Sequence, residues 1–226
     1  MASTITEPLE TDGRLLRERV YEELRHDILT CALMPGAEIR EAELAARFEV
    51  SKSPVRDALI SLEREGLVIT TPRQGYRVAP VSISDMLDMF HLRAALERAN
   101  MERIIRHASD EQLDALDQFK HFSASQWPDG FVSYNKSFHR RLAELGGNPR
   151  MRDQLIDLID LMERAVQISV SNMNHGKPEA LVAEHREIIE VIQSRSIKTA
   201  QRLAEQHVLA AGKRVSNAVS RSMIVN

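Results

Sequence analysis

The stretch that decides the fold runs from Val50 to Val78 and reads VSKSPVRDALISLEREGLVITTPRQGYRV. Pro54 suits the first position of a helix, where its missing N–H costs nothing. From Val55 onward, apolar residues recur with the spacing of one helical face, as far as Gly66, which suits a left-handed cap. Residues 67–70 and 76–79 have the composition of two short strands joined by a turn. The stretch predicts a turn, a helix and a β-hairpin in succession.

A second, shorter helix is predicted immediately before this stretch, at residues 41–48. Its apolar residues, Leu44, Ala45 and Phe48, share one side. Two helices joined by a short turn form a helix-turn-helix, whose second helix enters the major groove of DNA with its N-terminal residues at the base edges. The hairpin that follows would form a wing. The order of elements therefore predicts a winged helix-turn-helix domain that binds double-stranded DNA.

The candidate DNA-binding residues lie in the turn, at the start of the second helix and in the hairpin. A positive side chain at a helix N-terminus opposes the helix dipole, so helix stability does not explain Lys52 or Arg56. Arg56 is placed to contact guanine or phosphate. A solvated basic face remains the alternative for Arg64 and Arg77. The full candidate set is Arg40, Ser51, Lys52, Ser53, Pro54, Arg56, Thr71, Arg73, Gln74 and Gly75.

Composition narrows the class of protein. The chain has 226 residues with a net charge of −3 and a pI near 6.3, which argues against a strongly basic, non-specific nucleic-acid binder. Only 4% of the residues are aromatic, and the abundance of Leu, Ala, Glu and Arg favours helix. The single Cys31 excludes an internal disulfide and fits a reducing cytoplasm. No apolar run is long enough for a membrane span or a signal peptide, so we expect a cytoplasmic protein without a membrane partner.

The rest of the chain predicts an all-helical bundle, so the fold class is mostly α. We expect a disordered tail at residues 1–13, the winged helix at 14–81, with a helix over residues 15–31 at its start, and the bundle at 82–222, with Ser84 as the first N-cap. Six antiparallel helices joined by short loops are predicted. They cover residues 86–107, 109–125, 131–145, 149–170, 178–194 and 197–219.

Three histidines stand on the predicted inward faces of different helices: His139, His185 and His207. Asn135 precedes His139 by four residues, so the two side chains point the same way. Imidazoles that project from several helices into one bundle can converge on a metal ion. The alternative is three hydrogen-bonded core histidines that never meet.

Arg93 and Glu97 lie one helical turn apart near the inner face of the first bundle helix. One interpretation is an ion pair at helical spacing. The other is that Arg93 binds the carboxylate of an effector through a bidentate contact.

The motifs of both halves resemble a known family in their order and separation. Residues 33–39 (LMPGAEI), 43–45 (ELA), 50–59 (VSKSPVRDAL) and 62–68 (LEREGLV) look like the winged helix of the GntR family of bacterial transcription regulators. The second half is similar to the effector domain of its FCD (FadR-type) subgroup, in the shorter six-helix, VanR-like version. The residues that carry this likeness are 92–97 (LRAALE), 135–139 (NKSFH), 147–149 (GNP), 184–185 (EH) and His207.

The resemblance implies a homodimeric regulator, acting as a repressor on a palindromic operator and switched by a small organic acid. It also implies a divalent metal, zinc or nickel, held by three histidines and one Asp; here the Asp position is Asn135. The implied metal ligands are Asn135, His139, His185 and His207, and the effector-binding residues are these four with Arg93 and Glu97. We expect the effector to release the operator.

Two other classes of function compete with this interpretation. A metal-dependent enzyme would need a general base or nucleophile near the histidines, but Cys31 lies in the other domain and Glu184 is expected to point away from His185. A nucleoid-type architectural protein would bind DNA without an effector, which the acidic pI and the large bundle disfavour. We therefore expect a regulator and not an enzyme.

Overall fold

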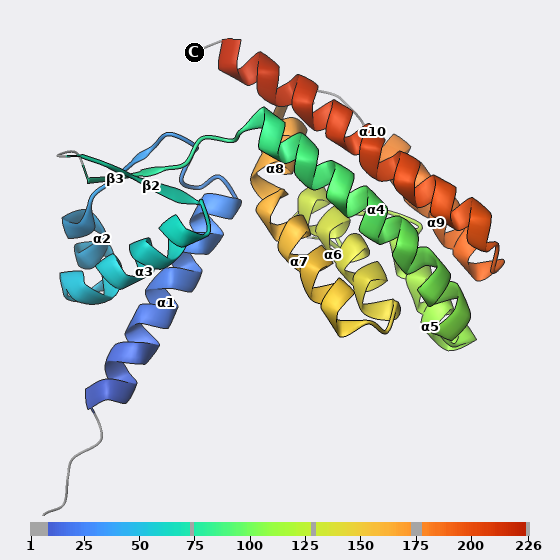
Figure 1. Cartoon of the computed structure of the whole chain (residues 1–226), viewed down its shortest axis with the longest axis horizontal. Coiled ribbons are helices and arrows are strands. Elements are labelled where there is room, and N and C mark those ends of the chain that lie inside the picture. The colour runs from blue at the N-terminus through green and yellow to red at the C-terminus, as the bar shows by residue number, and fades with distance from the viewer. Residues whose placement is uncertain (1–8, 73–74, 128–129, 173–177, 225–226) are drawn as a thin grey trace, which may run out of the picture. The chain divides into compact units, whose positions relative to one another are not determined.

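The computed structural model describes residues 9–72, 75–127, 130–172 and 178–224. The chain divides into two compact units, Met1–Val81 and Ser82–Asn226 (Figure 1). None of the helices in the described ranges combines the length and the hydropathy that crossing a bilayer requires.

The first unit is a winged helix-turn-helix. Its elements are α1 (Leu9–Leu29), β1 (Glu38–Ile39), α2 (Glu41–Phe48), α3 (Lys52–Arg64), β2 (Val68–Thr71) and β3 (Gly75–Val78). The strands form an antiparallel sheet in the order β1-β3-β2. Helix α1 packs along α3, and Val20, Leu24, Val55 and Leu59 are fully buried. Burying one such side chain stabilises the fold by roughly 1.5–3 kcal/mol, so this unit has a core of its own.

Several boundaries in the first unit differ from the sequence prediction. Helix α1 begins at Leu9, so residues 9–13 are helical rather than part of a tail; residues 1–8 lie outside the described ranges. Helix α3 begins at Lys52, so Lys52 and Ser53 belong to its first turn and not to the preceding turn. Gly66 has a φ of 71°, as predicted for a left-handed cap.

Strand β1 was not predicted from the sequence. It has only two residues, whose partners in β3 are Arg77 for Glu38 and Tyr76 for Ile39. Two residues are too few to show the alternation of polar and apolar side chains that marks a strand. Its role is to cover the edge of β3, which leaves the β2–β3 hairpin as the wing.

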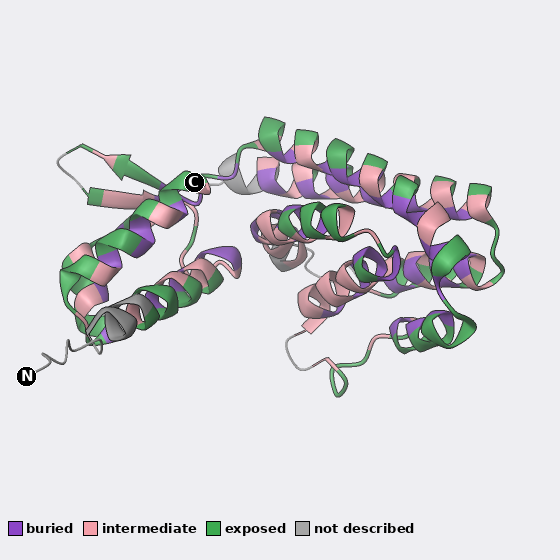
Figure 2. Ribbon diagram, turned by 60° about the horizontal axis from the view of Figure 1, so that its bottom comes forward, coloured by how far each residue is buried: buried purple, intermediate pink, exposed green. Residues whose placement is uncertain are grey.

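The second unit is helical throughout its described residues. It contains α4 (Ile83–His107), α5 (Asp110–Asp114), a 3-10 helix η1 (Ala115–Phe119), α6 (Gly130–Leu145), α7 (Pro149–Leu161), α8 (Glu163–Asn172), α9 (Glu179–Gln193) and α10 (Ile197–Ile224). The two longest helices, α4 and α10, lie side by side (Figure 1). Buried and exposed residues form stripes along the helices (Figure 2), as amphipathic helices around one core require.

Three features of the second unit correct the prediction. The N-cap of α4 is Ser82, whose side chain accepts from the Asp85 N–H, and not Ser84. The helix expected over residues 149–170 is divided at Met162 into α7 and α8, without a proline or glycine to signal it. The helix expected over residues 109–125 is only α5 followed by η1. The six predicted helices therefore become seven α-helices and one 3-10 helix over the described residues.

An aromatic cluster surrounds Tyr134 of α6 in the core of the bundle. Trp127 stacks on Phe119 with ring centroids 5.6 Å apart and meets Tyr134 edge-on at 5.5 Å. The Tyr134 hydroxyl donates to the Phe119 carbonyl oxygen at 2.6 Å. Such aromatic pairs add to the stability gained from burial alone. The cluster fixes Tyr134 at the edge of the histidine site.

Candidate functional site

The three predicted histidines meet in the core of the second unit. His139 comes from α6, His185 from α9 and His207 from α10, and their side chains are almost fully buried. The centroids of each pair of rings lie between 4.8 and 5.4 Å apart. One ring nitrogen from each lies within 4.8 Å of the others. The prediction that the three residues converge is confirmed, and the alternative of separate core histidines is wrong.

The hydroxyl of Tyr134 determines which ring nitrogen of His185 carries the proton. This hydroxyl has one hydrogen, which it donates to the Phe119 carbonyl oxygen. His185 Nδ1 lies 3.1 Å from the same hydroxyl oxygen, so Nδ1–H must be the donor there. The Nε2 of a neutral His185 then bears a lone pair, and this buried atom has no hydrogen-bond partner in the described structure. A buried lone pair without a partner is a position where a cation fits.

The other two histidines are oriented by carboxylates. His207 Nδ1 donates to Glu184 Oε2 at 2.6 Å, and His139 Nδ1 lies 3.1 Å from Glu97 Oε1, although not aligned for a hydrogen bond. A carboxylate favours the proton on the nearer nitrogen, which leaves the lone pair on Nε2. The Nε2 atoms of His139 and His207 face each other at 3.4 Å. A histidine backed by a carboxylate in this way is the usual arrangement of a metal ligand.

The protonation states of the buried groups agree with this assignment. Burial, with the nearby Arg93 guanidinium, lowers the pKa of His139 to about 4. Burial also holds the pKa of His185 well below its ordinary value. Burial alone would raise the pKa of the Glu97 carboxyl, but His139 and Arg93 hold it below its usual range. At neutral pH His139 and His185 therefore favour the neutral imidazole, the form that binds metal ions.

Arg93 and Glu97 form a buried ion pair, in which Arg93 Nε donates to Glu97 Oε1 at 2.7 Å. The interpretation of this pair as an ion pair at helical spacing is therefore confirmed. Because both side chains are almost fully buried, the pair is more than a weak surface contact. Arg93 also lines the cavity beside the histidines, so a role in effector binding remains compatible with the pair.

A cavity of about 40 Å³ adjoins the histidines. Asn135, His139 and His207 lie in its wall with Arg93 and Arg214, and Phe90, Phe131 and Val166 belong to its apolar part. One water needs roughly 10–15 Å³ of cavity volume, so the cavity holds only a few waters or a small molecule. Asn135 thus lies in the wall of the same cavity as two of the histidines.

Sequence reasoning missed the residues that orient the histidines. Glu184 was expected to point away from His185, and its contacts lie on α10: its carboxylate accepts from His207 and forms an ion pair with Arg214 at 3.1 Å. The partner of Glu184 is on the neighbouring helix, so inspection of its own helix could not reveal the contact. Arg214 lies two turns after His207 on α10, and this spacing is the signal that would have placed it on the same face.

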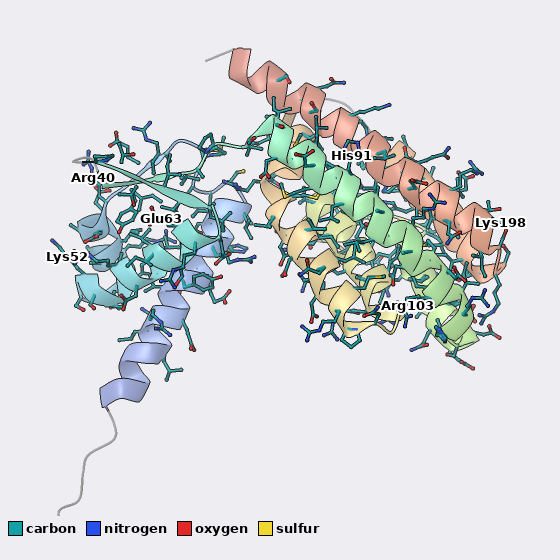
Figure 3. All side chains as sticks on the ribbon, viewed as in Figure 1. Arg40, Lys52, Glu63, His91, Arg103 and Lys198 are labelled. Atoms are coloured by element: carbon teal, nitrogen blue, oxygen red, sulfur yellow. The ribbon has the colours of Figure 1, made fainter. Side chains whose placement is uncertain are left out.

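The candidate DNA-binding residues lie on one part of the first unit. Ser51, Lys52 and Ser53 are exposed at the N-terminus of α3, and Figure 3 shows Lys52 and Arg40 at the margin of this unit. Pro54, beside them in the first turn of α3, is partly buried. Thr71 and Gly75 are paired where the hairpin strands end. Arg73 and Gln74, at the expected tip of the wing, lie outside the described ranges.

Two of the candidate arginines already have acidic partners. Arg40 lies 3.5 Å from Glu38 and 3.2 Å from Glu43. Arg56 binds both carboxylate oxygens of Glu41. Lys52 makes no ion pair with any described residue. Local acidic residues therefore offset much of the basic charge on this face, in keeping with the overall charge of −3.

Comparison with known proteins identifies the class of both units. Residues 16–78 match the profile of bacterial regulatory proteins of the gntR family, and residues 88–210 match the FCD domain. The chain therefore belongs to the GntR family of bacterial regulators, in the group with an FCD domain. It is a transcription regulator, like its relatives, and not an enzyme.

The individual relatives share about a quarter of their residues with this chain. It is 27% identical over 197 residues to the HTH-type transcriptional repressor RspR of Escherichia coli, covering 85% of this chain and 86% of that protein. It is 28% identical over 195 residues to the regulator YdhC of Bacillus subtilis, covering 84% of each. In fold it resembles E. coli McbR/YncC, with a TM-score of 0.71 at 17% identity, covering 85% of this chain and 93% of that one.

Proposed function

We propose that this regulator is a ligand-responsive repressor whose effector is a small carboxylic acid bound beside a divalent metal ion. The observation that carries the proposal is the convergence of one ring nitrogen from each of three buried histidines, two of which line a cavity that also presents two arginines. His139, His185 and His207 would hold the ion, and zinc or nickel suits a set of imidazole ligands. When bound, the ion supplies positive charge and a free coordination position for an anion.

Asn135 shapes this proposal because it replaces the carboxylate that the resemblance implies. A neutral amide leaves the site with one negative charge fewer than an Asp would. Glu97 is paired with Arg93, and Glu184 is paired with Arg214. The negative charges of these carboxylates balance the arginines, so they do not neutralise the charge of a bound metal ion. An anionic effector is the natural partner of the remaining positive charge. The small cavity favours an acid with few carbon atoms, and Arg93 and Arg214 are the groups that would bind its carboxylate.

We also propose that the protein binds, as a homodimer, a palindromic operator with two-fold symmetry. A homodimer presents two winged helices related by a two-fold axis, so the operator needs two matching half-sites. Helix α3 would enter the major groove, with Lys52 and Ser53 on phosphates and Arg56 at a base edge. The effector must bind the DNA-competent and incompetent arrangements with different affinity in order to switch them. We propose that the effector favours release of the operator.

The decisive experiment measures metal content and its effect on stability in the full chain. We expect about one equivalent of metal per chain, with a melting temperature that falls on chelation and recovers with zinc or nickel. His139→Ala should abolish both effects, whereas His91→Ala, which changes an exposed histidine of α4, should abolish neither. Absence of metal and of any melting shift would overturn the metal site and leave a metal-free pocket around Arg93.

The second experiment tests the effector and the direction of the switch. Short-chain carboxylic acids are screened by melting against the metal-loaded protein, and those that bind are added to an operator titration. We expect weaker operator binding in the presence of a bound acid. An acid that binds and tightens the complex would overturn the proposed direction, while a screen in which no acid raises the melting temperature would overturn the effector class.

A further inference from the structure

Arg56 of the recognition helix is joined to the preceding helix by a bidentate contact. Its Nε donates to Glu41 Oε1 at 3.1 Å, and its Nη2 donates to Glu41 Oε2 at 2.9 Å. Glu41 is the first residue of α2, and Arg56 lies near the start of α3. The pair therefore connects the two helices of the helix-turn-helix on the face that carries the candidate DNA contacts.

The contact leaves one edge of the guanidinium group available. Glu41 takes the N–H on Nε and one N–H on Nη2, so both N–H groups on Nη1 and the second on Nη2 remain. These N–H groups form the end of the planar fork. The same end is the one that can donate two parallel hydrogen bonds to the O6 and N7 of guanine. The contact with Glu41 therefore fixes the plane of the group without blocking its reading edge.

Glu41 is the better anchored member of the pair. Its side chain is 22% exposed, against 58% for Arg56. The N-terminus of α2 favours a carboxylate at this position. The hydrogen bonds from Arg56 hold the pKa of Glu41 below its usual range, and burial together with the Glu41 carboxylate raises the pKa of Tyr76 on strand β3. An ionised Glu41 thus lies where α2, α3 and the wing strand β3 come together.

Folding stability does not account for this arrangement. Ion pairs in which one partner is as exposed as Arg56 contribute little to stability, because water and salt screen them. An arginine that projected freely from α3 would add to the attraction for any phosphate backbone. The paired arginine has its charge largely offset, so its attraction for DNA of arbitrary sequence is reduced.

We infer that Glu41 is a positioning residue for DNA recognition, which holds Arg56 in the orientation that reads a guanine and lowers its affinity for non-specific DNA. The inference rests on the proposed contact between α3 and the operator. It predicts that loss of the Glu41 charge lowers discrimination between sequences while it raises binding to unrelated DNA. A purely structural ion pair would change neither.

The test uses the full chain and an operator selected from a pool of duplexes with a randomised central segment. Glu41→Gln is compared with Glu43→Gln, which removes the same charge from the same helix but from a carboxylate paired with Arg40. Each protein is titrated with the selected duplex, with versions changed at single G·C pairs, and with an unrelated duplex of equal length. Titrations at several salt concentrations give the dependence of affinity on salt.

The expected result is specific to Glu41→Gln. Discrimination should fall about tenfold at one G·C pair of each half-site, which is within the range for loss of a well-formed bidentate base contact. Binding to the unrelated duplex should strengthen, with a log–log salt slope steeper by about one for each recognition helix bound. Glu43→Gln should keep the discrimination of the unchanged chain. Equal discrimination in the two variants would overturn the inference.

An Arg56→Gln variant separates this inference from the proposed function. If Arg56→Gln binds the selected duplex as well as the unchanged chain does, then Arg56 has no role in operator binding, and the proposed contact fails together with the inference. If Arg56→Gln weakens binding while Glu41→Gln leaves discrimination intact, then only the positioning role fails. Arg56→Lys keeps the charge without the planar fork, so it should lose the same discrimination as Glu41→Gln. Melting temperatures close to that of the unchanged chain would exclude misfolding as the cause.

Discussion

At the scale of single residues, the proposed metal site predicts that the Glu184 carboxylate, which accepts from His207, raises the affinity of the site for a cation. Glu184→Gln removes the negative charge but keeps an oxygen that can accept from His207 Nδ1–H. We expect an affinity for zinc about tenfold lower, the smaller end of the range for such supporting groups. Competition with a chromogenic chelator at pH 7.5 measures this affinity. Glu187→Gln, an exposed change on the same helix, is the matched control and should leave it unchanged. Equal affinities for zinc in the two variants would show that Glu184 does not support the metal site and acts only as the ion-pair partner of Arg214.

The buried histidines also make the stability of the metal-free protein depend on pH. An unfolded His139 takes up a proton near pH 6.5, but the folded one does so only near pH 4. Between these values the unfolded chain binds more protons, so the free energy of unfolding decreases as the pH falls. From pH 6.5 to pH 5, His139 alone contributes a loss on the order of 2 kcal/mol. Denaturant titrations of the chelated protein measure it. His139→Gln should show a smaller decrease, and an identical decrease would refute the assignment.

At the scale of elements, the turn after α6 packs against α4 so closely that one position requires glycine. A Cβ at Gly146 would collide with the side-chain amide of Asn100, which is buried and donates to the Leu142 carbonyl oxygen at 2.7 Å. Gly146→Ala should therefore lower the free energy of unfolding by about 1–3 kcal/mol, as overpacking does. Adding Asn100→Ala makes room for the methyl group, so the double variant should lose less than the sum of the two single variants. Additive losses in chemical denaturation would contradict this account.

The elements also show which parts of the structure the sequence could predict. The periodicity of Val55, Ala58, Leu59 and Leu62 predicted α3, because all four residues are buried on one face. The position of each histidine on the inward face of its helix likewise predicted that the three side chains come together in the core. The division of α7 from α8 at Met162 and the contact of Glu184 with His207 depend on packing between helices that are distant in sequence. No local pattern marks such contacts, so they became visible only in the structure.

At the scale of the whole molecule, the proposed dimer predicts a fixed spacing of the half-sites. An insertion of about five base pairs between them rotates one half-site to the opposite side of the DNA, since a helical turn takes roughly ten. If the helical unit holds two winged helices together, affinity should fall by about 100-fold, because the second half-site no longer binds within the same complex. An insertion of about ten base pairs should restore part of it. Unchanged affinity with the shorter insertion would mean that each winged helix binds independently.

Trp127, the only tryptophan of the chain, lies two contacts from the histidine site. It packs against Tyr134, and the Tyr134 hydroxyl accepts from His185 Nδ1. Binding of an ion at His185 should therefore change the surroundings of Trp127, the single tryptophan fluorophore of the chain. Emission from this indole should report occupancy of the site without any attached dye, and a paramagnetic ion such as Cu²⁺ should quench it. Under the proposed function, the fluorescence of Trp127 would therefore follow metal or effector binding in the unlabelled protein.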